Sequence, residues 1–201
     1  MKKNSSIQEL LGQTDIYLID QIMKGRYDFD HKILDAGCGT GRNMHWFLLN
    51  NMDIHGVDLN EGAINSIKIK YPHFLDNHLH IAAVEKMPFH DHHFDHVISS
   101  AVLHFANSTL QFQHMLAEMV RVLKNGGTVF IRMTSNIGIE DKVALIADGV
   151  YQIPDGTKRF LLTRSLLHDC MQQLHLSFID PLKTVNVDDI RCMSTLVLQK
   201  H

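Results

Sequence analysis

The stretch from Ile33 to Asn43, which reads I-L-D-A-G-C-G-T-G-R-N, constrains the fold of this chain more than any other. An apolar run ends near Asp35, glycines follow at positions 37, 39 and 41, and an apolar segment comes directly after them. This pattern predicts a strand, a tight turn and a helix that begins at Gly41. Alternate glycines permit positive φ and close backbone approach, and the first N–H groups of a helix would face the same space. We therefore expect a small ligand to lie across this turn.

The spacing of the glycines separates two classes of ligand. A dinucleotide fingerprint, G-x-G-x-x-G, needs its third glycine at position 42, where this chain has Arg42. The pattern Asp35-x-Gly37-x-Gly39-x-Gly41 instead resembles motif I of the class I S-adenosylmethionine-dependent methyltransferases. A glycine turn on its own can be purely structural, so the remaining motifs have to support the ligand.

Three later segments resemble the same superfamily in the same order along the chain. They are V-E-K-M-P-F from Val84, F-D-H-V from Phe94 with L-H at Leu103, and E-M-V-R-V-L-K-N-G-G from Glu118. The resemblance covers about residues 30–134 and is to the small-molecule type of these enzymes. It implies a Rossmann-like fold and S-adenosyl-L-methionine as the cofactor.

The order of apolar patterns predicts the fold class independently of the resemblance. Strands are expected over 31–36, 53–58, 79–84, 94–100 and 128–133, with helices between them, a further helix from Thr163 to Leu174, and two closing strands over 177–187 and 193–199. Such β-α-β alternation predicts a doubly wound α/β sheet of about seven strands, mostly parallel with an antiparallel C-terminal hairpin. We expect one domain over residues 1–201.

The resemblance assigns cofactor contacts to the carboxyl ends of the expected strands. Asp58 follows Asp35 by 23 residues, close to the offset at which a nucleotide-binding βαβ unit presents a carboxylate to ribose, although an acid there can also cap the next helix. Many relatives carry an acid where this chain has Ala83, so the adenine contact is expected from Val84 backbone and Glu85. The expected cofactor-binding residues are Asp35, Gly37, Cys38, Gly39, Asp58, Leu59, Val84, Glu85, Ser99 and Ser100.

We expect transfer of the sulfonium methyl group to a small-molecule acceptor. His104 is the candidate catalytic base, because an imidazole can take a proton at neutral pH; the alternative is a histidine that packs at the start of a helix. Two other functions stay open, namely a non-catalytic S-adenosylmethionine-binding or sensor module and a methyltransferase acting on a macromolecule. A formal net charge of −3 supplies no basic field for nucleic acid, and S-S-A-V at Ser99 lacks an asparagine-proline type site.

Two regions outside the motifs are candidates for covering the site. Residues 1–28 are expected to form a helical lid, with Tyr17 and Arg26 as possible cofactor contacts, or else to pack a helix on the sheet. Residues 134–162 lose clear periodicity and are expected to form a substrate cover.

The remaining predictions concern metals, membranes and localisation. The histidines between His90 and His96 lack the i, i+4 spacing of a helical metal site and are interpreted as a solvated loop, so no metal is expected. The three cysteines have no C-x-x-C spacing, and no apolar run is long enough to span a bilayer. We expect a cytoplasmic protein without a nucleic-acid or membrane partner; the sequence does not determine its oligomeric state.

Overall fold

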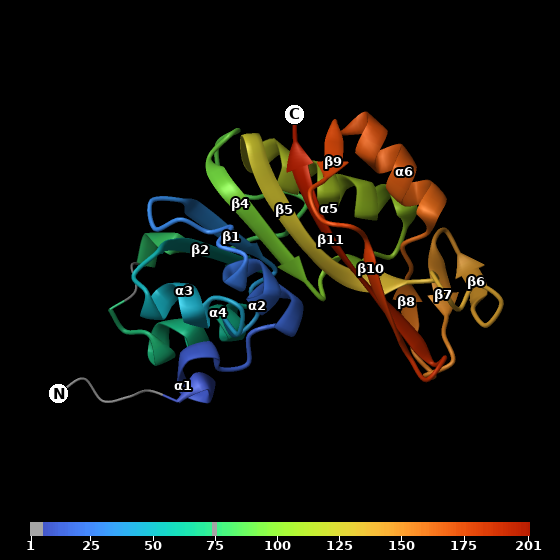
Figure 1. Ribbon diagram of the computed structural model, residues 1–201, viewed down its shortest axis with the longest axis horizontal. Helices are drawn as coiled ribbons and strands as arrows, with labels where there is room; N and C mark the ends of the chain where they lie inside the picture. The colour runs from blue at the N-terminus through green and yellow to red at the C-terminus, as the bar shows by residue number, and fades with distance from the viewer. Residues whose placement is uncertain (1–5, 74–75) are drawn as a thin grey trace.

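The computed structural model describes residues 6–73 and 76–201, and its centre is a mostly parallel sheet in the order β10-β11-β5-β4-β1-β2-β3, with β9 beside β11 (Figure 1). Strands β1 to β5 pair in parallel, whereas β11 pairs antiparallel with β5, β9 and β10. This confirms the predicted fold class. The strands are β1 (Lys32–Ala36), β2 (Asp53–Asp58), β3 (Leu79–Ile81), β4 (Phe94–Ser100), β5 (Leu123–Ser135), β9 (Leu176–Phe178), β10 (Lys183–Val187) and β11 (Arg191–Lys200).

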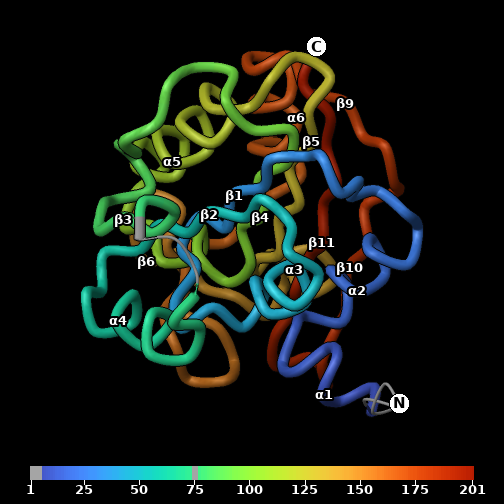
Figure 2. Tube along the Cα trace, turned by 90° about the vertical axis from the view of Figure 1, so that its left-hand side faces the viewer, coloured from blue at the N-terminus to red at the C-terminus, as the bar shows by residue number. Residues whose placement is uncertain are grey.

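Helices cover both faces of the sheet, and Figure 2 shows α5 and α6 on one side of it and α2, α3 and α4 on the other. Neighbouring strand residues serve opposite faces: Leu34 and Val97 pack with the α5 side, whereas Ile33 and Ile98 pack with the α3 side. The helices are α1 (Ile7–Leu11), α2 (Ile16–Met23), α3 (His45–Leu49), α4 (Glu61–Lys70), α5 (Thr109–Val122) and α6 (Arg164–Gln173), with short 3₁₀ turns η1 (Asp76–His78) and η2 (Leu103–Phe105).

Three helices start at residues whose side chains cap them. The side chains of Asn60, Ser108 and Thr163 each accept a backbone N–H bond at the start of a helix, as their residue types favour. The closing strand predicted over 177–187 is wrong, because it divides into β9 and β10 on either side of Pro181, which has no N–H for a sheet ladder. β3 stops at Ile81, and β5 begins at Leu123 with a register shift opposite Phe94 and His96.

Residues 134–162 form a second, smaller sheet after the end of β5. Its antiparallel strands are β6 (Ala144–Ala147), β7 (Val150–Gln152) and β8 (Lys158–Phe160). Phe160 is buried and stacks on Phe112 of α5, and the Arg159 guanidinium lies 5.2 Å from the ring centre of Phe105 in η2. The small sheet is therefore anchored beside the segment that follows β4. In the described part of the chain, no helix combines the length and apolarity that a membrane span requires.

Candidate functional site

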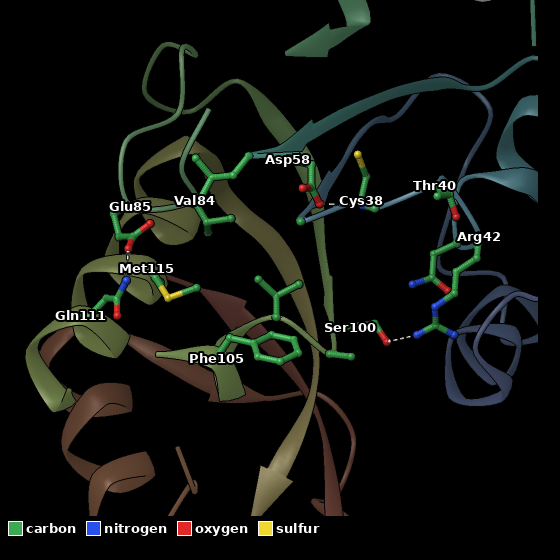
Figure 3. A pocket seen from close by; sticks show the side chains of 16 residues that line it. Cys38, Thr40, Arg42, Asp58, Val84, Glu85, Ser100, Phe105, Gln111 and Met115 are labelled. Atoms are coloured by element: carbon green, nitrogen blue, oxygen red, sulfur yellow. Dashed lines mark hydrogen bonds between the residues drawn. The ribbon is translucent and has the colours of Figure 1, made fainter. Parts of the chain in front are cut away.

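A cavity of about 550 Å³ lies at the carboxyl ends of β1, β2 and β4, where open α/β sheets bind ligands (Figure 3). Eight of the ten predicted cofactor residues line it, namely Gly37, Cys38, Gly39, Asp58, Leu59, Val84, Glu85 and Ser100. The other two, Asp35 and Ser99, are each 1% exposed and are buried in the strands that lead to the cavity. The structure thus brings together residues that stand up to 63 positions apart in the sequence.

The glycine turn after β1 provides space for a ligand. Gly37 has φ +80°, and a Cβ atom there would lie 2.4 Å from Cγ2 of Val102. Gly39 has φ +52° and its Cβ position meets no described atom within 4 Å. A larger residue at position 37 would therefore clash with the cavity wall, whereas position 39 is constrained by its backbone conformation alone.

The predicted start of the helix at this turn is wrong. α3 begins at His45, not at Gly41, and the intervening residues form turns. The N–H groups of Gly37 and Cys38 donate to the Val57 carbonyl at 2.8 and 3.0 Å, and that of Gly41 donates to Cys38 at 2.9 Å. The turn thus makes room for a ligand, while the N–H groups of its residues Gly37, Cys38, Gly39 and Gly41 pair with the protein.

Asp58 sits at the end of β2 with both carboxylate oxygens engaged. Its Oδ2 accepts the Gly39 N–H and its Oδ1 accepts the Asn60 N–H, each at 2.8 Å. The two bonds tie β2 to the glycine turn and to the start of α4, so a structural role and a ligand-binding role are compatible. Each carboxylate oxygen keeps a second lone pair, so the group can still accept from ligand hydroxyls.

Asp35 is a buried acid two residues before Gly37. Its Oδ2 has no hydrogen-bond partner among the residues that the structure describes. Burial raises the pKa of this carboxyl to about 7, while Arg42 acts to lower it and Asp58 to raise it further. Ser99 Oγ is likewise buried without a partner within residues 6–73 and 76–201. Uncompensated polar atoms of this kind are costly and commonly occur at functional sites.

The far wall of the cavity carries a polar pair that the sequence did not reveal. Glu85 Oε1 accepts a hydrogen bond from Gln111 Nε2 of α5, as the dashed line in Figure 3 shows. Leu59 is 70% exposed and Val84 is buried, so an apolar flank accompanies this pair. Gln111 and Met115 both line the cavity and are four residues apart on α5, a spacing that places them on one helix face.

The opposite wall is built around Ser100 and the buried acid Asp15. Ser100 Oγ donates to Asp15 Oδ2 at 3.2 Å and accepts from Arg42 Nη2 at 3.0 Å. Arg132 Nη1 also donates to Asp15 Oδ2, at 2.8 Å. Asp15 is 4% exposed and caps α2 through the Tyr17 N–H, so it joins the N-terminal segment to the cavity. Sequence reasoning missed both Asp15 and Arg42.

The two N-terminal residues predicted as possible cofactor contacts do not line the cavity. The Tyr17 ring lies beneath the Arg132 guanidinium at 4.9 Å and packs with the core on the α3 side of the sheet. Arg26 pairs with Asp180 at 2.6 Å. Both observations favour the alternative in which this helix packs on the sheet.

His104, the candidate base, is 7% exposed in η2 and does not line the cavity. Its ring packs against Phe105 with centroids 4.5 Å apart. Burial lowers the pKa of His104 to about 4, with Arg159 and Arg191 acting in the same direction. Its imidazole is therefore neutral at pH 7, and its neighbour Phe105 is the residue of η2 that faces the cavity.

The histidines from His90 to His96 are only partly a solvated loop. His90 and His92 are exposed, as predicted, and Nδ1 of His92 lies 3.1 Å from the Leu123 carbonyl. The prediction is wrong for His96, which is buried in β4 and contacts Thr128 Oγ1 at 2.7 Å and His31 Nδ1 at 2.8 Å.

Comparison with known proteins identifies relatives of this chain. Residues 34–131 match the family described as "Methyltransferase domain". An Encephalitozoon cuniculi protein provisionally named a methyltransferase is 31% identical over 151 residues, which is 75% of this chain and 65% of that protein. The chain thus spans less than two thirds of the length of this curated relative.

Solved structures share the fold at low sequence identity. A S-adenosylmethionine-dependent methyltransferase from Clostridium acetobutylicum superimposes with a TM-score of 0.70 at 14% identity, covering 98% of this chain and 93% of the other. The Burkholderia thailandensis 1,6-didemethyltoxoflavin-N1-methyltransferase, solved with 1,6-didemethyltoxoflavin and S-adenosylhomocysteine, gives 0.64 at 18% identity and covers 90% and 75% of the two chains.

Proposed function

We propose that this chain, which resembles the class I S-adenosylmethionine-dependent methyltransferases in its matched domain and its fold, transfers the methyl group of S-adenosylmethionine to a small-molecule acceptor. The observation that carries this proposal is the single cavity in which Asp58, the glycine turn and Glu85 meet. No other described cavity combines a turn that excludes side chains with an acid at a parallel strand end.

The residues of the cavity fit the cofactor in chemistry as well as in position. Asp58 has lone pairs for ribose hydroxyls, and the exposed Leu59 with Val84 offers apolar surface for the adenine. Glu85 and Gln111 supply polar atoms at the same end, where Ala83 leaves no acid. Asp35 stands two positions before Gly37 and Ser99 stands next to Ser100 of the cavity, and each has a buried polar atom that is unpartnered in the described residues.

The cofactor supplies a methyl group that its sulfonium already activates for transfer. The protein therefore has to hold donor and acceptor in line and away from water. Val102, Phe105 and Met115 give the cavity an apolar wall suited to excluding water. The Arg159 guanidinium of β8 lies over the Phe105 ring, which supports residues 134–162 as the cover of the acceptor.

Three observations support a small acceptor over a macromolecule. The cavity is of the size that ligands occupy, the net charge of −3 gives no attraction for nucleic acid, and the related Burkholderia protein holds a small heterocycle. His104 remains the hypothesis for a base. Unchanged turnover of His104→Gln would assign it to packing and leave Phe105 as the functional residue of η2.

The test combines calorimetry with a screen for turnover. Purified protein is titrated with S-adenosylmethionine, then incubated with pooled small metabolites while S-adenosylhomocysteine is measured. We expect 1:1 binding, loss of affinity in Asp58→Ala, and product with at least one pool. Binding without turnover on any pool would favour the sensor module, turnover only with nucleic acid or protein would favour a macromolecular acceptor, and no binding would overturn the proposal.

A further inference from the structure

A second cluster of chemically active side chains lies at the other end of β2 from Asp58. Asp53 and His55 are two positions apart on this strand and share one face of the sheet. β3 pairs in parallel with β2, with Leu79 opposite Gly56, and this register brings His78 level with His55. Strand pairing therefore assembles a carboxylate and two imidazoles that are not recognisable as a group in the sequence.

One donor atom of each of the three side chains lies close to the others, and Nδ1 of His78 also lies 3.2 Å from the Ile54 carbonyl, a contact that a metal bond to this nitrogen would replace. Nε2 of His55 lies 3.0 Å and Nδ1 of His78 lies 3.7 Å from the same Asp53 oxygen, Oδ1. The two rings stack with centroids 3.9 Å apart and 14° between their planes. One ligand atom from each residue can be chosen so that all three lie within 4.8 Å of one another.

These separations match what a metal ion requires. In a tetrahedral zinc site with bonds near 2.1 Å, neighbouring donor atoms are about 3.4 Å apart. The two measured distances of 3.0 and 3.7 Å lie on either side of that value. We infer that Asp53, His55 and His78 form a binding site for a divalent transition-metal ion, and that zinc is the ion their donor set fits best.

The access of the cluster favours such a site. Asp53 and His78 line a cavity of about 670 Å³, which provides an entry path and room for water as a further ligand. The donor set of three protein ligands with one open position is a known zinc arrangement.

The metal site is separate from the cofactor cavity, so the inference does not depend on the proposed methyl transfer. Asp53 and Asp58 are the first and last residues of β2, about 16 Å apart at the rise of a strand. A bound ion would connect β2 to the η1 turn just before β3. We therefore expect a stabilising role for the ion, with cofactor affinity unchanged.

The experiment titrates Zn²⁺ into tag-free, chelator-treated full-length protein by calorimetry and records the visible spectrum with Co²⁺. We expect one equivalent of Zn²⁺, a rise in Tm, and the intense visible absorption of tetrahedral Co²⁺. His78→Gln and Asp53→Asn should each weaken Zn²⁺ binding at least about tenfold, the scale of even second-shell losses. His73→Gln is the matched control, because His73 lines the same cavity outside the cluster and should leave affinity unchanged.

Two results would overturn the inference. Equal Zn²⁺ affinity in the wild type, His78→Gln and Asp53→Asn would assign binding to other histidines of the chain. A protein that binds no Zn²⁺ would leave a stacked histidine pair whose partners are Asp53 and the Ile54 carbonyl. Anomalous diffraction at the zinc edge on the wild type decides the matter if a variant fails to fold. The peak is expected between the three side chains, and a peak elsewhere would refute the site.

Discussion

The two ends of β2 carry the same residue type in different surroundings. Asp58, at the carboxyl end, accepts backbone N–H groups beside a glycine turn, whereas Asp53, at the amino end, faces two stacked imidazoles. The first carboxylate keeps lone pairs for ligand hydroxyls and the second is one of three convergent donors. The chemistry of each acid therefore depends on the neighbours that the sheet brings to it.

Burial shifts pKa values at both edges of the sheet, in opposite directions for an acid and for a histidine. At the carboxyl edge it raises the pKa of Asp35 to about 7, and at the amino edge it lowers the pKa of His96 to about 4. In each case the low-dielectric interior favours the neutral form. The two edges can therefore be disturbed independently by substitution, by ligand and by pH.

The largest effect is expected from closing the space at the carboxyl edge with Gly37→Ala. The added Cβ would meet Val102 at 2.4 Å and the residue would have to adopt φ +80°. Strain of about 1–2 kcal/mol and overpacking of about 1–3 kcal/mol together predict a loss of roughly 3 kcal/mol in the free energy of unfolding. Urea denaturation measures this, and calorimetry should show no S-adenosylmethionine binding.

Gly25→Ala is the control for backbone strain alone. Gly25 has φ +66° and no described atom within 4 Å of its Cβ position. The Gly25→Ala variant should lose only about 1–2 kcal/mol in the free energy of unfolding and should keep its affinity for the cofactor. Equal losses in the two variants would mean that the contact with Val102 relaxes freely, and Zn²⁺ binding should survive in both because the amino edge is untouched.

The second prediction replaces each of the two acids of β2 in turn and measures the affinity of both variants for both ligands. Asp58→Asn should weaken S-adenosylmethionine binding about 10- to 100-fold, the scale of a lost charged hydrogen bond, and leave Zn²⁺ affinity unchanged. Asp53→Asn should show the reverse pattern. Asparagine has one oxygen acceptor, so it can retain only one of the two backbone bonds of Asp58, and the loss of the other is part of the expected effect. If either variant weakened both ligands, the edges would be coupled and the comparison would fail.

The contrast between the edges also explains how much the sequence could predict. The sites at the carboxyl edge follow local motifs, since Gly37, Cys38 and Gly39 belong to one turn and Asp58 ends the next strand. Strand ends of this kind can be located from apolar runs and helix caps. Eight of the ten predicted cofactor residues consequently line the cavity, although their binding roles await the calorimetry.

What the sequence could not reveal depends on register and on long-range packing. Asp15 reaches Ser100 across 85 positions, and His78 reaches Asp53 only because β3 pairs with β2. The helix expected from Gly41 begins at His45 because the preceding residues form turns whose bonds involve Cys38 and Gly41. Neither apolar periodicity nor motif spacing carries information on such pairings.

The third prediction uses pH to act on the amino edge through His96. Its folded-state pKa of about 4 lies below the unfolded value of 6.5, so the unfolded chain binds the proton first as the pH falls. The contribution of His96 to the free energy of unfolding is complete above pH 6.5 and decreases between pH 6.5 and 4. The loss at pH 5 is about 2 kcal/mol.

The measurement is urea denaturation at pH 7 and pH 5. Between these pH values, the free energy of unfolding of His96→Gln should fall by about 2 kcal/mol less than that of the wild type, because Gln does not titrate. His55 and His104 are also buried with lowered pKa values, and they remain in both proteins. The difference therefore isolates His96, and identical pH dependence in the two proteins would contradict the assigned pKa.

The smallest effect is expected from Gln111→Ala, which removes the partner of Glu85 while leaving every strand end in place. Loss of the hydrogen bond to Glu85, about 0.5–1.5 kcal/mol, predicts S-adenosylmethionine binding weaker by roughly 3- to 10-fold. The bond that Gln111 accepts from the Asn107 N–H is lost as well. Gln113→Ala is the matched control, because Gln113 lies on the same helix outside the cavity. Equal affinities of the two variants in calorimetry would remove Glu85 and Gln111 from the adenine end, and the carboxyl edge would then depend on Asp58 and the glycine turn alone.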